Sequence, residues 1–177
     1  MHARYAANIS ALRRHHKSLK FPFDSSVFPS ATYNLGPRTV THPHLDFFNA
    51  AFGWCAITAL GSFDYRKGGH LILWDLDLVI EFPPGATIFV PSAVTSHSNV
   101  AISEGEHHYS VTQYAAAGLF RWVDNGFKSN RSLSRKQRKL QQQANSTLWE
   151  DSLSLYSIIY PTSPISLPQD LLPQYTE

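Results

Sequence analysis

Short apolar runs separated by glycine and proline fill the middle of the chain. From residue 31 to about 124, runs rich in Val, Ile, Thr, Tyr and Phe alternate with Gly-Pro, Gly-Gly and Pro-Pro-Gly. Runs of this length and spacing favour an all-β sandwich or barrel. The expected strands lie near 31–35, 38–47, 54–62, 70–74, 77–82, 86–91, 97–101 and 107–116. Strands in this number without helices between them predict a mainly β fold, a double-stranded β-helix of jelly-roll or cupin-like type.

Helical patterns flank this region on both sides. Residues 3–19 repeat apolar positions at helical spacing, residues 128–145 are polar and basic, and residues 146–160 carry an apolar stripe. The tail beyond Pro161 is rich in proline and is expected to be extended. The pattern therefore divides the chain into an N-terminal helix and loop (1–30), a β-helix domain (31–127) and a basic helical segment with a proline-rich tail (128–177).

Composition narrows the class of protein. Hydrophobic residues make up 43% of the 177 residues and charged residues 16%, so the chain can bury a core and is not a disordered tail. Its single cysteine, Cys55, excludes an intramolecular disulfide and a cysteine-rich zinc site. The net charge of +2 does not by itself indicate a nucleic-acid binder. Because no apolar run approaches the roughly 20 residues of a membrane helix and no secretory signal is visible, we expect an intracellular protein of the nucleus or cytoplasm with no membrane partner.

Candidate metal ligands follow from a His-x-Asp motif and a later histidine. His44 and Asp46 are two positions apart, so on a strand their side chains would share one face. The motif alone is weak, since this composition would produce it about 0.4 times by chance. His97 follows a Pro-Pro-Gly turn and an apolar run, which strengthens the case. Two histidines and one carboxylate form the facial triad of non-haem Fe(II) oxygenases, so we expect His44, Asp46 and His97 to bind Fe(II).

Longer sequence blocks extend the comparison to a family. The order His-x-Asp, Pro-Gly turn, apolar strand and distal histidine over residues 31–125 resembles the Fe(II)/2-oxoglutarate dioxygenases. More narrowly, the blocks at 52–55, 59–64, 67–75 and 112–122 resemble a fungal group related to the TET/JBP oxygenases, which oxidise methyl groups of DNA bases. The resemblance implies that His44, Asp46 and His97 match the iron ligands. It also implies 2-oxoglutarate as co-substrate, O₂ and an organic substrate as partners, and more N-terminal structure in relatives, which leaves a degenerate or a truncated copy as alternatives for this chain.

One departure from the family concerns the co-substrate. The family places an arginine two residues before a serine to hold the distal carboxylate of 2-oxoglutarate; here the serine is Ser110 and the arginine position is His108. Loss of a bidentate guanidinium pair could cost about 2–5 kcal/mol of binding. Three outcomes are compatible with this change: a protonated His108 binds weakly, Arg38 or Arg121 substitutes, or the protein has lost turnover.

Two further co-substrate candidates, Asn34 and Arg38, lie on or beside the run that precedes His44. In the resembling fold this region borders the co-substrate, whereas Asn34-Leu-Gly-Pro37 also has the residues of a plain turn. The basic stretch at 128–145 fits either phosphate contacts, which makes DNA a candidate partner, or a solvated helix.

Three functions remain as hypotheses. The first is a dioxygenase that oxidises a C–H bond of a methylated base, a protein side chain or a small molecule. The second is a catalytically inactive β-helix module that binds metal or nucleic acid. The third is a cupin-like metalloenzyme, which would need His70 or His42 as a further ligand.

Overall fold

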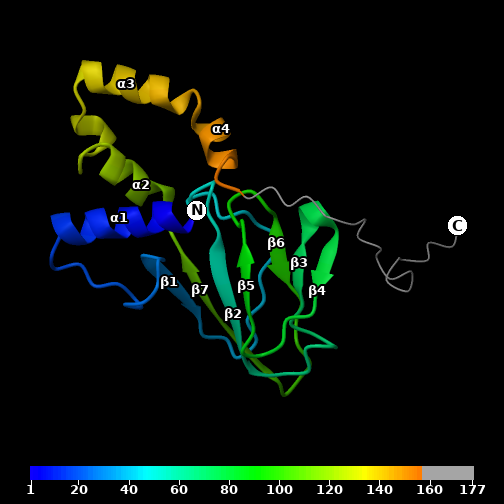
Figure 1. Cartoon of the computed structure of the whole chain (residues 1–177). Helices are drawn as coiled ribbons and strands as arrows, with labels where there is room; N and C mark the ends of the chain where they lie inside the picture. Colours follow the sequence, from blue (N-terminus) through cyan, green and yellow to red (C-terminus); the bar gives the residue numbers. More distant parts are fainter. Residues whose placement is uncertain (157–177) are drawn as a thin grey trace, which may run out of the picture.

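Two antiparallel sheets face each other in the computed structural model, which describes residues 1–156 (Figure 1). The larger sheet has the order β1-β7-β2-β5 and the smaller one β4-β3-β6. The strands are β1 (Ser30–Asn34), β2 (Cys55–Ser62), β3 (Leu71–Leu73), β4 (Leu78–Ile80), β5 (Thr87–Val90), β6 (His97–Asn99) and β7 (His107–Tyr114). This arrangement confirms the mainly β jelly-roll prediction.

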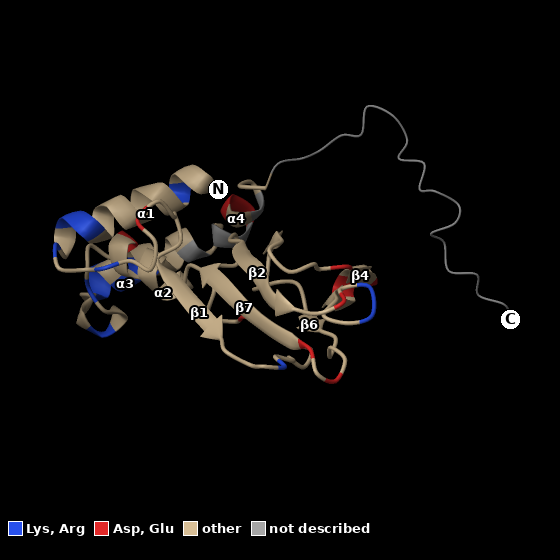
Figure 2. Ribbon diagram, turned by 90° about the horizontal axis from the view of Figure 1, so that it is seen from below, with Lys and Arg blue, Asp and Glu red and all other residues tan. Residues whose placement is uncertain are grey.

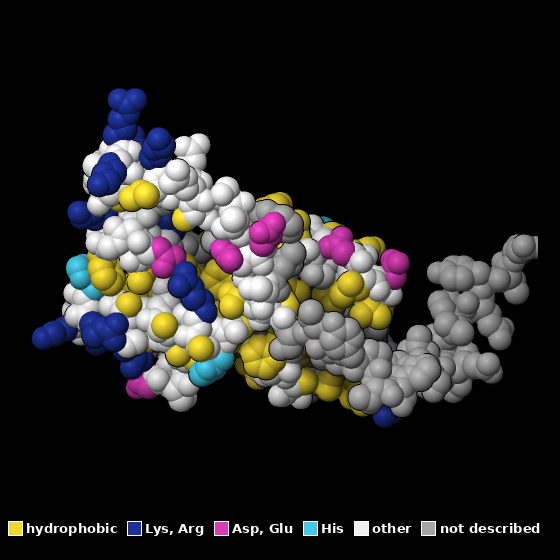
Figure 3. Space-filling model, turned by 45° about the horizontal axis from the view of Figure 1, so that its top comes forward, with side chains coloured by type: hydrophobic (Ala, Val, Ile, Leu, Met, Phe, Trp, Pro, Cys, Tyr) yellow, Lys and Arg dark blue, Asp and Glu magenta, His cyan; other side chains and the backbone are white. Residues whose placement is uncertain are grey.

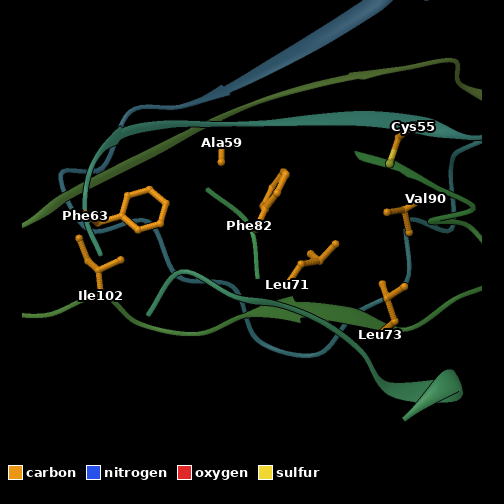
Figure 4. Packing of buried hydrophobic residues seen from close by; sticks show 8 residues of the cluster. All are labelled: Cys55, Ala59, Phe63, Leu71, Leu73, Phe82, Val90 and Ile102. Atoms are coloured by element: carbon orange, nitrogen blue, oxygen red, sulfur yellow. The ribbon is translucent and has the colours of Figure 1, made fainter. Parts of the chain in front are cut away.

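The core between the sheets depends on alternation along β2. Cys55 and Ala59 point inward and are fully buried in the cluster of Figure 4. Ala56 belongs instead to a second cluster, beneath the helices. The first part of β2 is therefore buried on both faces, which accords with its apolar and small residues, whereas its end, from Leu60 on, is exposed. The inner cluster comprises Cys55, Ala59, Phe63, Leu71, Leu73, Phe82, Val90 and Ile102.

The helices gather at one side of the sheets (Figure 1). They are α1 (His2–His15), α2 (Ala117–Asp124), α3 (Arg135–Asn145) and α4 (Leu148–Leu153), with short 3₁₀ turns at Trp74–Leu76 and Asn130–Ser132. Tyr5 of α1 joins α1 and α2 to the larger sheet, because its ring contacts Phe28, Phe52 and Phe120 edge-on. The flanking helices agree with the sequence prediction, although the first ends at His15 rather than at residue 19.

Two elements differ from the sequence prediction. Residues 38–47 form no strand and are tied to the sheets by isolated bridges, Arg38 to His108 and His44 to His97. Pro37 and Pro43 have no N–H to donate, which explains why a continuous ladder does not form. The helix α2 was not predicted, because Gly118 within it disfavours a helix. Residues 157–160 of the last expected helix, and the proline-rich tail, lie outside the described residues.

Charge is distributed unevenly over the molecule. Lys and Arg side chains concentrate on the helical side, around α1 and α3, as Figures 2 and 3 show. Asp and Glu residues lie mostly in the turns that connect the strands and on α4 (Figure 2). In the part of the chain that is described, no helix is both long and apolar enough to cross a bilayer.

Candidate metal centre

Backbone hydrogen bonds bring the three candidate ligands together although residues 38–47 form no strand. His44 N–H donates to the carbonyl of His97 at 3.1 Å, and His97 N–H donates back to His44 at 3.0 Å. The N–H of Asp46 donates to the carbonyl of Ser92 at 2.9 Å. This reciprocal bridge fixes the segment that carries His44 and Asp46 against the start of β6, so the fold itself positions the ligands.

The ligand atoms lie close enough to share one ion. One atom each from His44, Asp46 and His97 lies within 4.8 Å of the others, and His44 Nε2 is 3.7 Å from Asp46 Oδ1. Bonds from first-row metals to these atoms are about 2.0–2.2 Å, so two neighbouring ligands at right angles on one ion are about 3 Å apart. Small side-chain rotations would therefore bring all three atoms onto a metal.

Hydrogen bonds also select which atom of each side chain is free to ligate. Nδ1 of His44 is 2.8 Å from the carbonyl of His42, and Nδ1 of His97 is 2.9 Å from that of Thr95. A carbonyl only accepts, so each Nδ1 carries the hydrogen and each Nε2 is left as the ligand atom. Asn49 does the same for the carboxylate, because its Nδ2 donates to Asp46 Oδ2 at 3.1 Å and leaves Oδ1 free. Such outer contacts orient metal ligands and set their basicity.

Burial keeps one ligand in the form that binds metal. His97 is 5% exposed, and burial is the main cause that lowers the pKa of its imidazole. A neutral imidazole is the form that coordinates a cation. His44 is exposed at the surface side of the cluster, and Asp46 is half-buried. The site therefore combines one buried ligand with an approach from solvent.

The donor set fits iron and does not include the additional histidines considered from the sequence. Among the described residues, these three form the one group of His, Cys, Asp or Glu side chains that could hold a metal. Neither His42 nor His70 joins it, which removes the support for a cupin-like four-ligand site. Imidazole and carboxylate without thiolate suit Fe(II), and three protein ligands leave positions for small ligands.

The triad opens into a cavity of about 480 Å³ between the two sheets. Apolar side chains, including Ile57, Leu71 and Phe82, line part of it. Polar side chains from β1 and β7 line another part: Asn34, His108 and Ser110. None of the described residues that line this cavity is lysine or arginine. The cavity is thus large enough for a small organic ligand and has no permanent positive charge of its own.

The structure brings together some of the co-substrate candidates and leaves others apart. His108, Ser110 and Asn34 share the triad's cavity, and Asn34 Nδ2 donates to Ser110 Oγ at 2.8 Å. Arg38 does not line it, and its guanidinium donates to the carbonyl of Ile102 at 3.0 Å. Arg121 lines a different cavity, beside α3.

Several residues of the site were not identified from the sequence. Asn49 holds both Asp46 and the hydroxyl of Ser92, at 3.1 and 3.2 Å. Asn99 accepts from Thr41 N–H at 2.8 Å and so holds the segment before His44 to β6. Phe47 and Phe48 lie at the cavity rim with exposed side chains, 77% and 89%. The only sequence signal was their position next to Asp46, which does not reveal what they contact.

Comparison with solved structures gives matches among oxygenases. A structure of NgTET1 in complex with 5mC DNA matches with a TM-score of 0.48 and 19% identity, over 64% of this chain and 47% of that one. A viral collagen prolyl hydroxylase from Paramecium Bursaria Chlorella virus-1, in a 2OG complex, matches with a TM-score of 0.35 and 14% identity, over 62% and 69% of the two chains.

At this level of similarity the matches carry no argument about the function of this chain. The chain spans about half the length of the NgTET1 structure. No family model matches the sequence, and no curated protein matches it. The function is therefore argued from the site.

Proposed function

We propose that this protein is a non-haem oxygenase that holds one Fe(II) through His44, Asp46 and His97 and uses a 2-oxo acid as co-substrate. The observation that carries the proposal is the set of three ligand atoms within 4.8 Å of one another at the wall of the 480 Å³ cavity. Two imidazoles and one carboxylate leave the positions that a chelating 2-oxo acid and O₂ would take. In the enzymes that the sequence resembles, this co-substrate is 2-oxoglutarate.

When bound, iron would supply the activation of O₂ that oxidation of a C–H bond requires. The chain's own contribution is geometric and electrostatic. Carbonyls of His42 and Thr95 fix the two imidazole rings, and Asn49 fixes the carboxylate. The apolar cavity wall excludes water from the place where the substrate would react.

We further propose a nucleic-acid base as the group that is oxidised. Phe47 and Phe48 directly follow the ligand Asp46 and expose their rings at the cavity rim. Planar bases stack on exposed aromatic rings irrespective of sequence. The basic side of the molecule, around α1 and α3, suits a phosphate backbone (Figure 3). A methylated base presents the C–H bond that such chemistry needs.

A second candidate function is a catalytically inactive module that binds metal or nucleic acid. The observation that favours it is the lack of a lysine or arginine among the described residues lining the cavity, where the family places an arginine. This module would bind the metal as the oxygenase does. It would differ by failing to bind a 2-oxo acid and by consuming no O₂.

Titration of the protein with Fe(II) and then with a 2-oxo acid, without oxygen, tests the proposal. We expect one Fe(II) per chain, and a new visible absorbance when the 2-oxo acid chelates it. His44→Ala, Asp46→Ala and His97→Ala should each abolish metal binding, because each removes one of three ligands. His42→Ala and His70→Ala are the matched controls and should bind iron normally. Normal iron stoichiometry in all three ligand variants would disprove the site, and iron binding without the new absorbance would favour the inactive module.

A further inference from the structure

A hydrogen bond to the backbone fixes which nitrogen of the His108 ring donates and which one accepts. His108 is 3% exposed and packs edge-on against Phe63. Its Nδ1 lies 3.1 Å from the carbonyl oxygen of Thr39. Because a carbonyl only accepts, Nδ1 carries the hydrogen, and Nε2 of the neutral ring is a bare acceptor. This Nε2 is buried and has no hydrogen-bond partner among the described residues.

A second hydrogen bond holds the Thr39 carbonyl that accepts from His108. Asn99 Nδ2 donates to the same Thr39 carbonyl at 2.8 Å. The orientation of that amide is set by its other end, because Asn99 Oδ1 accepts from the backbone N–H of Thr41 at 2.8 Å. Both interactions position the Thr39 carbonyl where it must accept from His108. On the neighbouring strand, Gly61 faces His108, and its backbone has a φ of +118°; a Cβ there would collide with the carbonyl of His107.

Ser110 adds a donor next to this acceptor. His108 and Ser110 are two positions apart on β7, and both line the cavity. Ser110 Oγ already accepts from Asn34 Nδ2 at 2.8 Å. Its own hydroxyl hydrogen remains available to donate. This part of the cavity therefore offers a paired acceptor, Nε2 of His108, and donor, the hydroxyl of Ser110.

A carboxylate would bind unfavourably beside the His108 Nε2 acceptor and the Ser110 hydroxyl. It has only acceptor oxygens, and one of them would face the lone pair of Nε2. No lysine or arginine among the described lining residues would neutralise it. Arg38 is engaged with the Ile102 carbonyl, and Arg121 lines another cavity. A buried carboxylate with no cation beside it and only the Ser110 hydroxyl to donate to it is disfavoured.

We propose that the His108–Ser110 end of the cavity takes an uncharged group that both donates and accepts, a carboxamide or a hydroxyl, so that the co-substrate is a 2-oxo acid with a neutral polar tail. A carboxamide N–H would donate to His108 Nε2, and its carbonyl would accept from Ser110. This inference rests on the proposed function for the chelating 2-oxo acid end. It changes the class of co-substrate from a dicarboxylate to a monocarboxylate.

Two unreactive probes of equal size test the inference. N-oxalylglycine ends in a carboxylate, and N-oxalylglycinamide ends in a carboxamide; both carry the same chelating oxalyl end. Their dissociation constants would be measured by calorimetry on the full chain loaded with Fe(II) in the absence of oxygen. We expect the amide to bind tighter to the wild type by about tenfold to a hundredfold, the usual effect of leaving a buried charged group unpaired.

Variants on β7 then test whether His108 and Ser110 cause the preference for the amide probe. His108→Arg should reverse the preference, because a guanidinium donates to a carboxylate and neutralises it. His107→Arg is the matched control, since it makes the same change at an exposed neighbouring position and should keep the wild-type preference. Ser110→Ala should weaken the amide while iron loading stays normal, and it provides a second test if His108→Arg does not fold.

The outcomes separate the inference from the proposed function. Equal or tighter binding of N-oxalylglycine to the wild type would overturn the inference and leave the 2-oxo acid oxygenase intact. Binding of neither probe to iron-loaded protein would overturn the co-substrate proposal, and the inference with it. The wild-type comparison depends on no variant.

Discussion

The three histidine rings that line the cavity are oriented by the same kind of contact. His44, His97 and His108 each place Nδ1 against a backbone carbonyl, at 2.8, 2.9 and 3.1 Å. In each ring this leaves Nε2 as the atom with a free lone pair. For His44 and His97 that atom faces a carboxylate and can ligate a cation. For His108 it lies outside the metal-ligand group and is left to accept a hydrogen bond.

A variant of Asn49 tests how much the hydrogen bonds that orient the candidate ligands contribute to Fe(II) affinity. We expect Asn49→Ala to lower Fe(II) affinity by about tenfold to a hundredfold, because Asp46 loses the hydrogen bond that fixes its second oxygen. Asn34→Ala, which removes a cavity amide that does not touch a ligand, should leave the affinity unchanged. Competition with a metal-binding dye under anaerobic conditions measures both. Equal affinities of wild type and Asn49→Ala would show that the carboxylate needs no such support.

At this scale the sequence identified the candidate ligands but not the residues that hold them in place. His44 and Asp46 are visible as a short motif, and His97 follows a recognisable turn and strand. The supports are contacts between positions far apart in the chain, such as Asn99 with Thr39 at 2.8 Å. No local pattern encodes a side chain that donates to a carbonyl sixty residues away. Cavity lining by His108 could be predicted only through the family resemblance.

At the scale of elements, Tyr5 links α1 to Trp54, directly before strand β2 of the larger sheet. Tyr5 O–H donates to the carbonyl of Trp54 at 3.2 Å and accepts from its N–H at 3.1 Å. The fit requires glycine at position 53, where a Cβ would collide with the Tyr5 hydroxyl. Helical periodicity predicted α1, whereas its docking site depends on contacts that the periodicity does not specify. The missed helix α2 is held in the same cluster through Phe120.

Tyr5→Phe should destabilise the fold by about 1–3 kcal/mol, because it leaves the buried N–H and carbonyl of Trp54 without partners. Tyr33→Phe, at a position 51% exposed, is the control and should have little effect. Urea unfolding followed by tryptophan fluorescence measures both. A change in Tyr5→Phe no larger than in the control would contradict this role.

Burial of Tyr5 also predicts that the stability of the fold falls at alkaline pH. Burial raises the pKa of Tyr5 to about 12, whereas an unfolded tyrosine ionises near about 10. The folded state therefore holds this proton more tightly, so its contribution is present below pH 10 and is lost as the pH rises toward 12. Tyr5→Phe should lack this part of the alkaline loss of stability, which urea unfolding at a series of alkaline pH values would measure.

At the scale of the whole molecule, charge separates into two regions. Residues 1–20 and 121–139 contain 12 of the 15 Lys and Arg residues and one acidic residue, Asp124. Residues 21–116 contain three basic and eight acidic residues. The net charge of +2 hides this asymmetry, which is why composition alone did not indicate an anionic partner. The basic region includes α1 and α3, which carry most of the blue in Figure 2.

We expect the basic region to bind double-stranded DNA with little sequence preference and with affinity that falls steeply as salt rises. Lys136→Gln with Lys139→Gln, on α3, should weaken binding equally on all sequences and reduce the salt slope by about one for each phosphate that is no longer neutralised. Arg66→Gln with Lys67→Gln removes the same charge from the sheet region and is the control. Fluorescence anisotropy at several salt concentrations gives both values. Equal effects of the two double variants would show that only net charge matters.

The segment from Pro37 to Asn49 has a further consequence for how the molecule holds its shape. It carries two of the three candidate ligands and forms one wall of the cavity, yet it forms no strand and is held by isolated bridges and a few hydrogen bonds, such as that from Thr41 N–H to Asn99 Oδ1. A cation bound by His44, Asp46 and His97 would cross-link it to β6 and restrict its conformational freedom. Anything that binds only the closed arrangement stabilises that arrangement by mass action. Metal binding and the closed conformation of this segment are therefore thermodynamically coupled. A chelator that removes the ion would also increase the conformational freedom of the segment.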